Sequence, residues 1–370
     1  MMRFQMTDEQ YMKLALEEAQ KGVGRTSPNP AVGALIVKDG VILGKGYHKK
    51  AGTPHAEIHA MNNTSCSLNG TTIYVTLEPC SHTGRTPPCC EAIAKAGISR
   101  VVIGMLDTNP LVDGRGVSYL QNSGIEVLSG VLKNECKNLN LPFLKYIQTS
   151  LPYMVMKAGV SLDGRLNYQS GVSGWITGEQ SGTRVHQLRD RFDAIMVGSG
   201  TIIADNPSLT ARLQDTKQSR DPVRIVLDSS LASPLSAKIY NQESEASTII
   251  FCSVNADKTK KRNFENIGVK VLTVDSSSRG LNLKEVLARI GEEGICSVLV
   301  EGGASIHGSL LREQLYDFAY LFYGPVFAGD SGQSLVSGID VKSNKVAPRL
   351  LEPNFQQLGD DMLVCGKIGY

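Results

Sequence analysis

A histidine, a glutamate and two cysteines in the first hundred residues have the types and order of a catalytic zinc site. His55 and Glu57 are two residues apart, and Cys80 and Cys89 follow after an apolar segment. One imidazole and two thiolates can hold zinc and leave a fourth position open for water. A carboxylate beside that water can move a proton to a departing amine. The pattern predicts hydrolytic deamination.

The spacing departs from the general zinc-deaminase pattern, in which H-x-E is followed by P-C-x-x-C. Eight residues separate Cys80 from Cys89, and Cys90 follows directly, so spacing alone leaves either thiol as the third ligand. We interpret Glu78, just before Pro79, as a structural carboxylate rather than a catalyst.

Glycine turns follow two apolar segments in the second half. Glu301 and Gly302-Gly303 come after Val298–Val300, and Gly198 and Gly200 come after a similar segment. Bare backbone at a helix N-terminus can bind phosphate. Neither turn has the G-x-G-x-x-G spacing of a dinucleotide fingerprint. Each turn alone is more often structural than nucleotide-binding.

The elements that must position these residues alternate between helix and strand, which predicts layered α/β domains. A break near Gln148–Pro152 indicates a domain boundary. For the first half we expect a helix from Thr7 or Asp8, strands Ala31–Lys38, Val41–Tyr47, Thr72–Thr76, Val101–Met105 and Glu126–Leu128, and helices His55–Met61 and Cys90–Ala96. For the second half we expect strands Tyr153–Gly159, Ala194–Val197, Val223–Leu227, Thr248–Phe251, Lys270–Val274 and Ser297–Val300, and helices Glu179–Phe192 and Ala304–Leu311.

Length and composition narrow the class of protein. A chain of 370 residues is long enough for two domains. The net charge of +2 is weak for a nucleic-acid enzyme and favours a small-molecule substrate. No apolar run is long enough to cross a membrane, and no secretory leader opens the chain, so we expect a cytoplasmic protein with neither nucleic acid nor membrane as partner.

The first half resembles a known family. The run from Cys80 to Cys89, together with Pro28–Gly33, His55–Ala60 and Asp107–Pro110, resembles the deaminase domain of bifunctional riboflavin-biosynthesis proteins of the RibD/RibG type. The resemblance implies a cytidine-deaminase-like α/β/α domain over residues 1–149. It implies His55, Cys80 and Cys89 as zinc ligands and Glu57 as proton shuttle. Positions used around the substrate match Asn29, His48, His82, Arg85, Asp107 and Asn109.

The second half resembles the reductase domain of the same family, which has a dihydrofolate-reductase-like α/β fold, over residues 150–370. The matching stretches are Met156–Gly164, Ser173–Thr177, Gly198–Thr201, Asp205–Arg212, Val226–Ser229 and Glu301–Gly303. The resemblance implies NADPH contacts at Gly159, Trp175, Thr201, Asp205, Ser229, Gly303, Ala304, Ser305, Ile306, His307, Gly308 and Ser309. It implies substrate contacts at Ser173, Arg189, Leu209, Arg212 and Glu301. Lys157 and Asp205 are the candidates beside the reacting carbonyl, and Trp175 could equally be a core anchor.

The resemblance implies two consecutive reactions and a homodimer or homotetramer. Zinc-dependent deamination converts 2,5-diamino-6-ribosylamino-4(3H)-pyrimidinone 5′-phosphate to 5-amino-6-(5-phosphoribosylamino)uracil. NADPH then reduces the ribosyl group to a ribityl chain. One alternative is a nucleoside or nucleic-acid zinc deaminase with an unrelated C-terminal module, which would need a basic surface for nucleic acid. Another is a zinc-stabilised binding protein without turnover, against which the presence of Glu57 argues.

Overall fold

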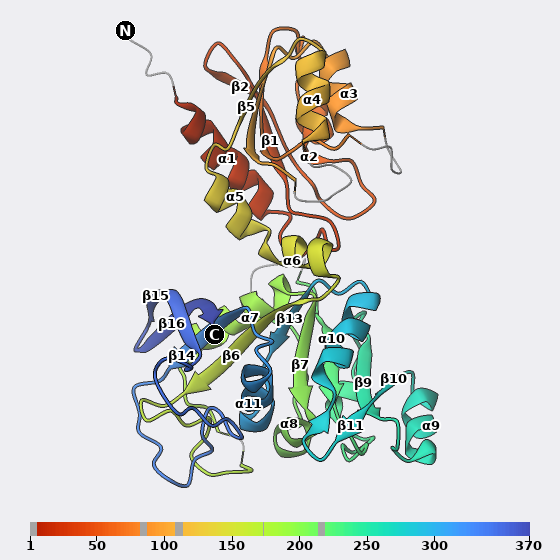
Figure 1. Cartoon of the computed structure of the whole chain (residues 1–370), viewed down its shortest axis with the longest axis vertical. Helices are drawn as coiled ribbons and strands as arrows, with labels where there is room; N and C mark the ends of the chain where they lie inside the picture. Colours follow the sequence, from red (N-terminus) through yellow and green to blue (C-terminus); the bar gives the residue numbers. More distant parts are fainter. Residues whose placement is uncertain (1–5, 82–86, 108–113, 173, 214–218) are drawn as a thin grey trace. The chain divides into compact units, whose positions relative to one another are not determined.

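The computed structural model describes residues 6–81, 87–107, 114–172, 174–213 and 219–370 (Figure 1). The chain divides into two compact units, Met1–Ser150 and Leu151–Tyr370, which we call the N-terminal and the C-terminal unit.

The N-terminal unit is built on a five-stranded sheet. Its order is β2-β1-β3-β4-β5, with β1 antiparallel to both neighbours and β3, β4 and β5 parallel. The expected hairpin is confirmed, because Asp39 and Gly40 both have positive φ (50° and 78°), as a tight turn of the primed type requires. The strands are β1 (Gly33–Lys38), β2 (Val41–Tyr47), β3 (Thr72–Leu77), β4 (Arg100–Met105) and β5 (Glu126–Ser129).

Helices cover both faces of this sheet (Figure 1). Leu35 and Val37 pack on one side with α1 and α5, whereas Ala34 and Ile36 pack on the other with α2, α3 and α4. The alternation along β1 thus builds two apolar layers. Thr7 caps α1 as expected. The helices are α1 (Asp8–Gln20), α2 (Ala56–Asn62), α3 (Cys89–Lys95), α4 (Arg115–Asn122), α5 (Lys133–Leu139) and α6 (Leu141–Thr149).

The C-terminal unit contains a nine-stranded sheet of order β10-β9-β8-β7-β13-β6-β14-β16-β15. The strands from β10 to β14 in this order are parallel, and β16 and β15 extend the sheet as an antiparallel hairpin. The strands are β6 (Tyr153–Val160), β7 (Ala194–Gly198), β8 (Val223–Leu227), β9 (Thr248–Ser253), β10 (Lys270–Val274), β13 (Ser297–Val300), β14 (Phe318–Tyr323), β15 (Arg349–Leu358) and β16 (Asp361–Gly369). A short separate hairpin joins β11 (Ser276–Ser277) and β12 (Gly280–Leu281).

Helices also lie on both faces of the parallel part of this sheet, as parallel strands require. One apolar layer includes residues of α10 and α11, and the other includes residues of α8 and α9. The expected α/β class is therefore confirmed in both units. The helices are α7 (Glu179–Arg191), α8 (Ser199–Asp205), α9 (Lys258–Asn266), α10 (Leu283–Glu292) and α11 (Ala304–Arg312). Among the described residues, none of the helices combines the length and the apolar character that a membrane crossing needs.

Candidate active sites

Three side chains converge in the N-terminal unit to form a candidate metal centre. His55 is the N-cap residue of α2, Cys80 follows β3, and Cys89 opens α3. His55 Nδ1 lies 3.2 Å from Cys89 Sγ and 3.5 Å from Cys80 Sγ. All three ligand atoms lie within 4.8 Å of one another. One nitrogen and two sulfurs at these separations fit zinc with an open fourth position.

A hydrogen bond couples the two thiols of this centre. The hydrogen bond from Cys89 lowers the pKa of Cys80, and the same bond raises the pKa of Cys89. The Cys89 backbone N–H also donates to Cys80 Sγ at 3.3 Å. A divalent cation bound here would displace the thiol protons, because thiolates are the metal-binding form.

Glu57 lies in the first turn of α2, beside the three ligands. Glu57 is buried, with only 3% of its surface exposed. Burial raises the pKa of Glu57 to about 6. A carboxyl group that titrates close to neutral pH can both accept and release a proton there.

Asn29 and His48 form a second pair in the N-terminal unit. Asn29 Nδ2 donates to His48 Nε2 at 3.1 Å, which leaves His48 Nδ1 to donate to the Pro54 carbonyl oxygen at 3.2 Å. Burial lowers the pKa of His48, so the ring is neutral, as this pattern of bonds requires. The ring of His48 meets that of His55 edge-on at 5.4 Å. The pair therefore adjoins the metal centre. His82, Arg85 and Asn109 lie outside the described residues.

Glu78 is a buried carboxylate that organises the backbone beside the site. Its oxygens accept N–H groups from Asp107 (3.2 Å), Gly114 (3.2 Å), Gly116 (3.0 Å) and Val117 (3.2 Å). These bonds hold the segment after β4, which contains Asp107, against the start of α4. The structural interpretation of Glu78 is confirmed.

We predict that Glu78→Ala destabilises the N-terminal unit by about 3 kcal/mol or more, because four N–H groups lose their acceptor. Urea unfolding of the full chain, monitored by the release of bound zinc, measures the change in the free energy of unfolding. Glu17→Ala, which removes an exposed carboxylate from α1, is the matched control and should stay within about 0.5 kcal/mol of wild type. Equal midpoints for the two variants would contradict the anchoring role of Glu78.

The structure distinguishes Cys89 from Cys90, whereas the spacing alone leaves either as the third ligand. Cys89 Sγ belongs to the ligand cluster, whereas Cys90 packs in the apolar layer with Ile93. Burial raises the pKa of Cys90 to about 11, so it remains a thiol.

We therefore expect Cys89→Ala to lose zinc and Cys90→Ala to retain about one zinc per chain, because only the first removes a ligand. Metal analysis of the two purified proteins after dialysis measures the difference. The reverse result, with zinc lost only in Cys90→Ala, would assign the third ligand to Cys90.

A cavity of about 930 Å³ occupies the C-terminal unit. It lies where parallel strands end, since Gly198 closes β7, Glu301 follows β13 and Ser229 follows β8. Crevices outside the carboxyl ends of parallel strands are the usual ligand sites of α/β sheets. Its lining includes the expected residues Lys157, Gly159, Trp175, Arg189, Thr201, Asp205, Leu209, Arg212, Ser229, Glu301, Gly303, Ala304, Ser305, Ile306 and Ser309.

A carboxylate of the cavity lining, Glu301, whose side chain is 9% exposed, joins two cations. Arg189 donates to Glu301 through Nε (2.8 Å) and Nη2 (2.9 Å), and Lys157 Nζ lies 3.4 Å from Glu301 Oε2. Parallel pairing of β6 and β13 sets Met156 opposite Val300, so Lys157 and Glu301 follow at one level. Burial opposes the charge of Glu301, but Arg189 and then Lys157 lower its pKa to about 2. Glu301 is therefore ionised and holds both cations in place.

A third nitrogen of Arg189 also donates within the protein. Its Nη1 donates to the Thr210 carbonyl oxygen at 3.2 Å. Arg212 instead is an exposed residue of the cavity lining. Arg212 is thus better placed than Arg189 to receive a phosphate group.

The glycine turns allow close packing within the cavity wall. A Cβ on Gly198 or on Gly302 would lie 2.8 or 2.9 Å from atoms of Ile306.

Two expected cofactor residues of α11 lie outside the cavity lining. His307 is buried, with Nδ1 2.7 Å from the Tyr316 hydroxyl, and burial lowers its pKa to about 3. A Cβ on Gly308 would lie 1.7 Å from the Ser337 carbonyl oxygen, so this glycine serves packing.

The cavity lining also includes Trp175, Leu209 and the pair Asn167 and Gln333. Trp175 is 73% exposed, which excludes the core-anchor interpretation. Leu209 has a φ of 53°, an uncommon left-handed conformation for a bulky residue. Asn167 and Gln333 line the cavity although no sequence pattern indicated them. Ser173 lies outside the described residues.

Family models match both units. The model described as "Cytidine and deoxycytidylate deaminase zinc-binding region" matches residues 5–105, and "RibD C-terminal domain" matches residues 152–364. The matches, the metal centre and the cavity define a bifunctional enzyme in which a zinc-dependent deaminase precedes an NADPH-dependent reductase.

Relatives of nearly full length define the family. The chain is 43% identical to riboflavin biosynthesis protein RibD of Bacillus amyloliquefaciens, covering 96% of this chain and 95% of the relative. It is 39% identical to RibD of Escherichia coli strain K12, covering 96% and 98%. The chain therefore belongs to the RibD family of riboflavin biosynthesis proteins.

Solved structures agree with this assignment. The RibD structure of Acinetobacter baumannii (form 1) matches with a TM-score of 0.88 and 35% identity over 98% of this chain and 99% of that one. A diaminohydroxyphosphoribosylaminopyrimidine deaminase/5-amino-6-(5-phosphoribosylamino)uracil reductase of Thermotoga maritima matches with a TM-score of 0.84 and 37% identity over 97% of each chain. The alternative of an unrelated C-terminal module is not supported, because the family resemblance extends over both units.

Proposed function

We propose that residues 1–149 deaminate 2,5-diamino-6-ribosylamino-4(3H)-pyrimidinone 5′-phosphate and that residues 150–370 reduce the product. The observation that carries the proposal is the cluster of His55, Cys80 and Cys89 beside the buried Glu57, in one chain with a cavity large enough for a nucleotide.

In the deaminase, His55, Cys80 and Cys89 hold zinc. Zinc, when bound, supplies the Lewis acidity that makes water a nucleophile at neutral pH. The Glu57 carboxylate takes a proton from the attacking water and delivers it to the departing amine, so that water and the amino substrate become the carbonyl product and ammonia. Asn29, oriented by neutral His48, and Asp107, held by Glu78, contact the pyrimidine.

In the reductase, the turn at Gly302-Gly303 and the N-terminus of α11 receive the pyrophosphate of NADPH. NADPH, when bound, supplies the hydride for the open-chain carbonyl carbon of the ribosyl group. The Lys157 ammonium, held by Glu301, donates the proton to the carbonyl oxygen. Arg212 binds the substrate phosphate, because the guanidinium of Arg189 is already engaged by Glu301 and Thr210. Asp205 lines the same cavity.

We expect purified protein to exchange one amino group of the diaminopyrimidinone ribosyl phosphate for oxygen without NADPH. With NADPH, the product should also gain two hydrogens. Mass spectrometry of both reactions measures these changes.

Glu57→Gln should keep zinc and lose deamination by about 10²- to 10⁴-fold, because the proton carrier is gone.

The reductase provides the internal control for this variant. Glu57→Gln should reduce the deaminated intermediate at the wild-type rate, because the two active sites are built from separate units. Unchanged substrate in both wild-type reactions would refute the proposed function. Near-normal deamination by Glu57→Gln would refute only the assigned proton carrier.

We propose that the enzyme is a homodimer or homotetramer that acts in the cytoplasm, where NADPH and reduced thiols are maintained. Support for assembly comes from the outer hairpin of the nine-stranded sheet, on which Leu351, Phe355 and Met362 are exposed. Light scattering should give a mass of two or four chains of 39.9 kDa, and Phe355→Lys should shift it toward one. A wild-type mass of one chain would contradict the assembly, and recovery outside the cytoplasmic fraction would contradict the location.

A further inference from the structure

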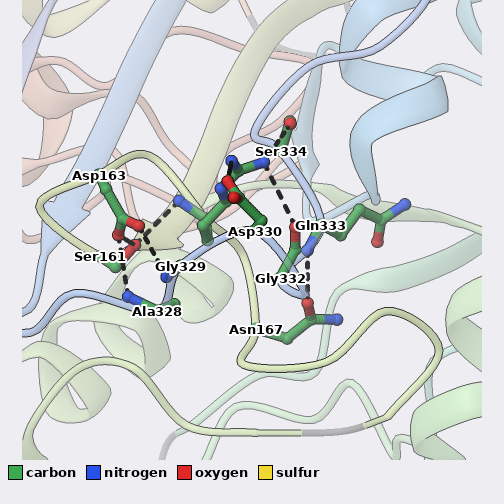
Figure 2. A network of polar contacts seen from close by, with 10 residues as sticks. Ser161, Asp163, Asn167, Ala328, Gly329, Asp330, Gly332, Gln333 and Ser334 are labelled. Carbon is green, nitrogen blue, oxygen red and sulfur yellow. Dashed lines mark hydrogen bonds and ion pairs between the residues drawn. The ribbon is translucent and has the colours of Figure 1, made fainter.

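Two loops of the C-terminal unit are fastened together beside the cavity. One follows β6 and the other follows β14, its neighbour in the sheet. The Asp163 carboxylate accepts the N–H groups of Ala328 (3.0 Å) and Gly329 (2.8 Å), and Ser161 Oγ also donates to it. Figure 2 shows this network, which we call the Asp163 clasp. It also contains Arg165, which contacts Asp330, Gly332 and Ser334.

The clasp fixes the backbone of Gln333. The Gln333 N–H donates to Asn167 Oδ1 at 2.8 Å, and its carbonyl accepts from the Leu166 N–H at 2.7 Å. A Cβ on the neighbouring Gly332 would lie 2.3 Å from the Asn167 carbonyl oxygen, so the two loops approach as closely as backbone allows. The position of Gln333 is therefore set by hydrogen bonds of its own N–H and carbonyl groups, and its side chain is not needed for them.

The side chain of Gln333 reaches the N-terminus of α11. It extends away from the clasp in Figure 2, and both Gln333 and Gly303 line the cavity. Gln333 Oε1 lies 3.9 Å from the position that a Cβ on Gly303, the N-cap residue of α11, would occupy. The first N–H groups of a helix have no acceptor within it. A carboxamide is thus held beside a set of backbone donors.

We propose that Gln333 binds NADPH, by donating its carboxamide N–H to the pyrophosphate that the N-terminus of α11 receives. This inference rests on the proposed function of the cavity. Rotation of the carboxamide by half a turn exchanges Oε1 for Nε2 and presents a donor. Because the clasp holds the residue before ligand arrives, little conformational freedom is lost on binding.

The test uses the full chain and reads binding directly. Trp175 is the single tryptophan and lines the cavity, so quenching of its fluorescence reports the Kd of NADPH and of NADH. Gln333→Ala keeps the backbone bonds of the clasp and removes only the carboxamide. Gln333→Glu places a carboxylate there, and Gln121→Ala, an exposed change in α4, is the control.

We expect Gln333→Ala to raise the Kd of NADPH and of NADH by a similar factor of about ten, because both dinucleotides carry the pyrophosphate. Gln333→Glu should raise both further through charge repulsion, and Gln121→Ala should raise neither. Unchanged Kd values in both Gln333 variants, or an effect on NADPH alone, would overturn the assignment to the pyrophosphate. If wild type binds no NADPH, the proposed reductase function fails as well, so the two failures are distinguishable.

Discussion

Both active sites depend on carboxylates that are removed from water, which is costly unless the charge is compensated. The protein meets this constraint in three ways. Glu78 is surrounded by four backbone N–H groups, and Glu301 by a guanidinium and an ammonium. Glu57 is buried with less compensation, and burial raises its pKa to about 6. The first two carboxylates therefore organise structure, whereas the third is suited to carry a proton.

The elements that carry the zinc ligands could be predicted because their signals are local, whereas α4, α5 and α6 were not expected from the sequence. The ligands belong to segments whose elements have strong patterns, and the observed starts of α2 and α3 differ from the expected ones by a single residue. A capping box at Thr7 and Gln10 and a positive-φ turn at Asp39-Gly40 are equally local. Such features need no knowledge of the tertiary fold.

The reductase cavity could be predicted only in part, because its contacts join distant segments. Arg189 and Glu301 are brought together by the order of parallel strands, which no spacing in the sequence reveals. Gln333 meets Asn167 for the same reason. The hairpin of β15 and β16 also escaped prediction, because β15 is exposed along most of its length and lacks the alternation of a half-buried strand. Resemblance supplied the α11 residues as one run, but a helix turns His307 and Gly308 away from the cavity.

The four apolar layers described above are each drawn from a single unit. A substitution that loosens one layer therefore removes contacts from one active site's scaffold and leaves the other scaffold's packing intact. In evolutionary terms, the two units can accumulate substitutions in their cores independently of each other. Selection still acts on both units together, because one chain carries both activities.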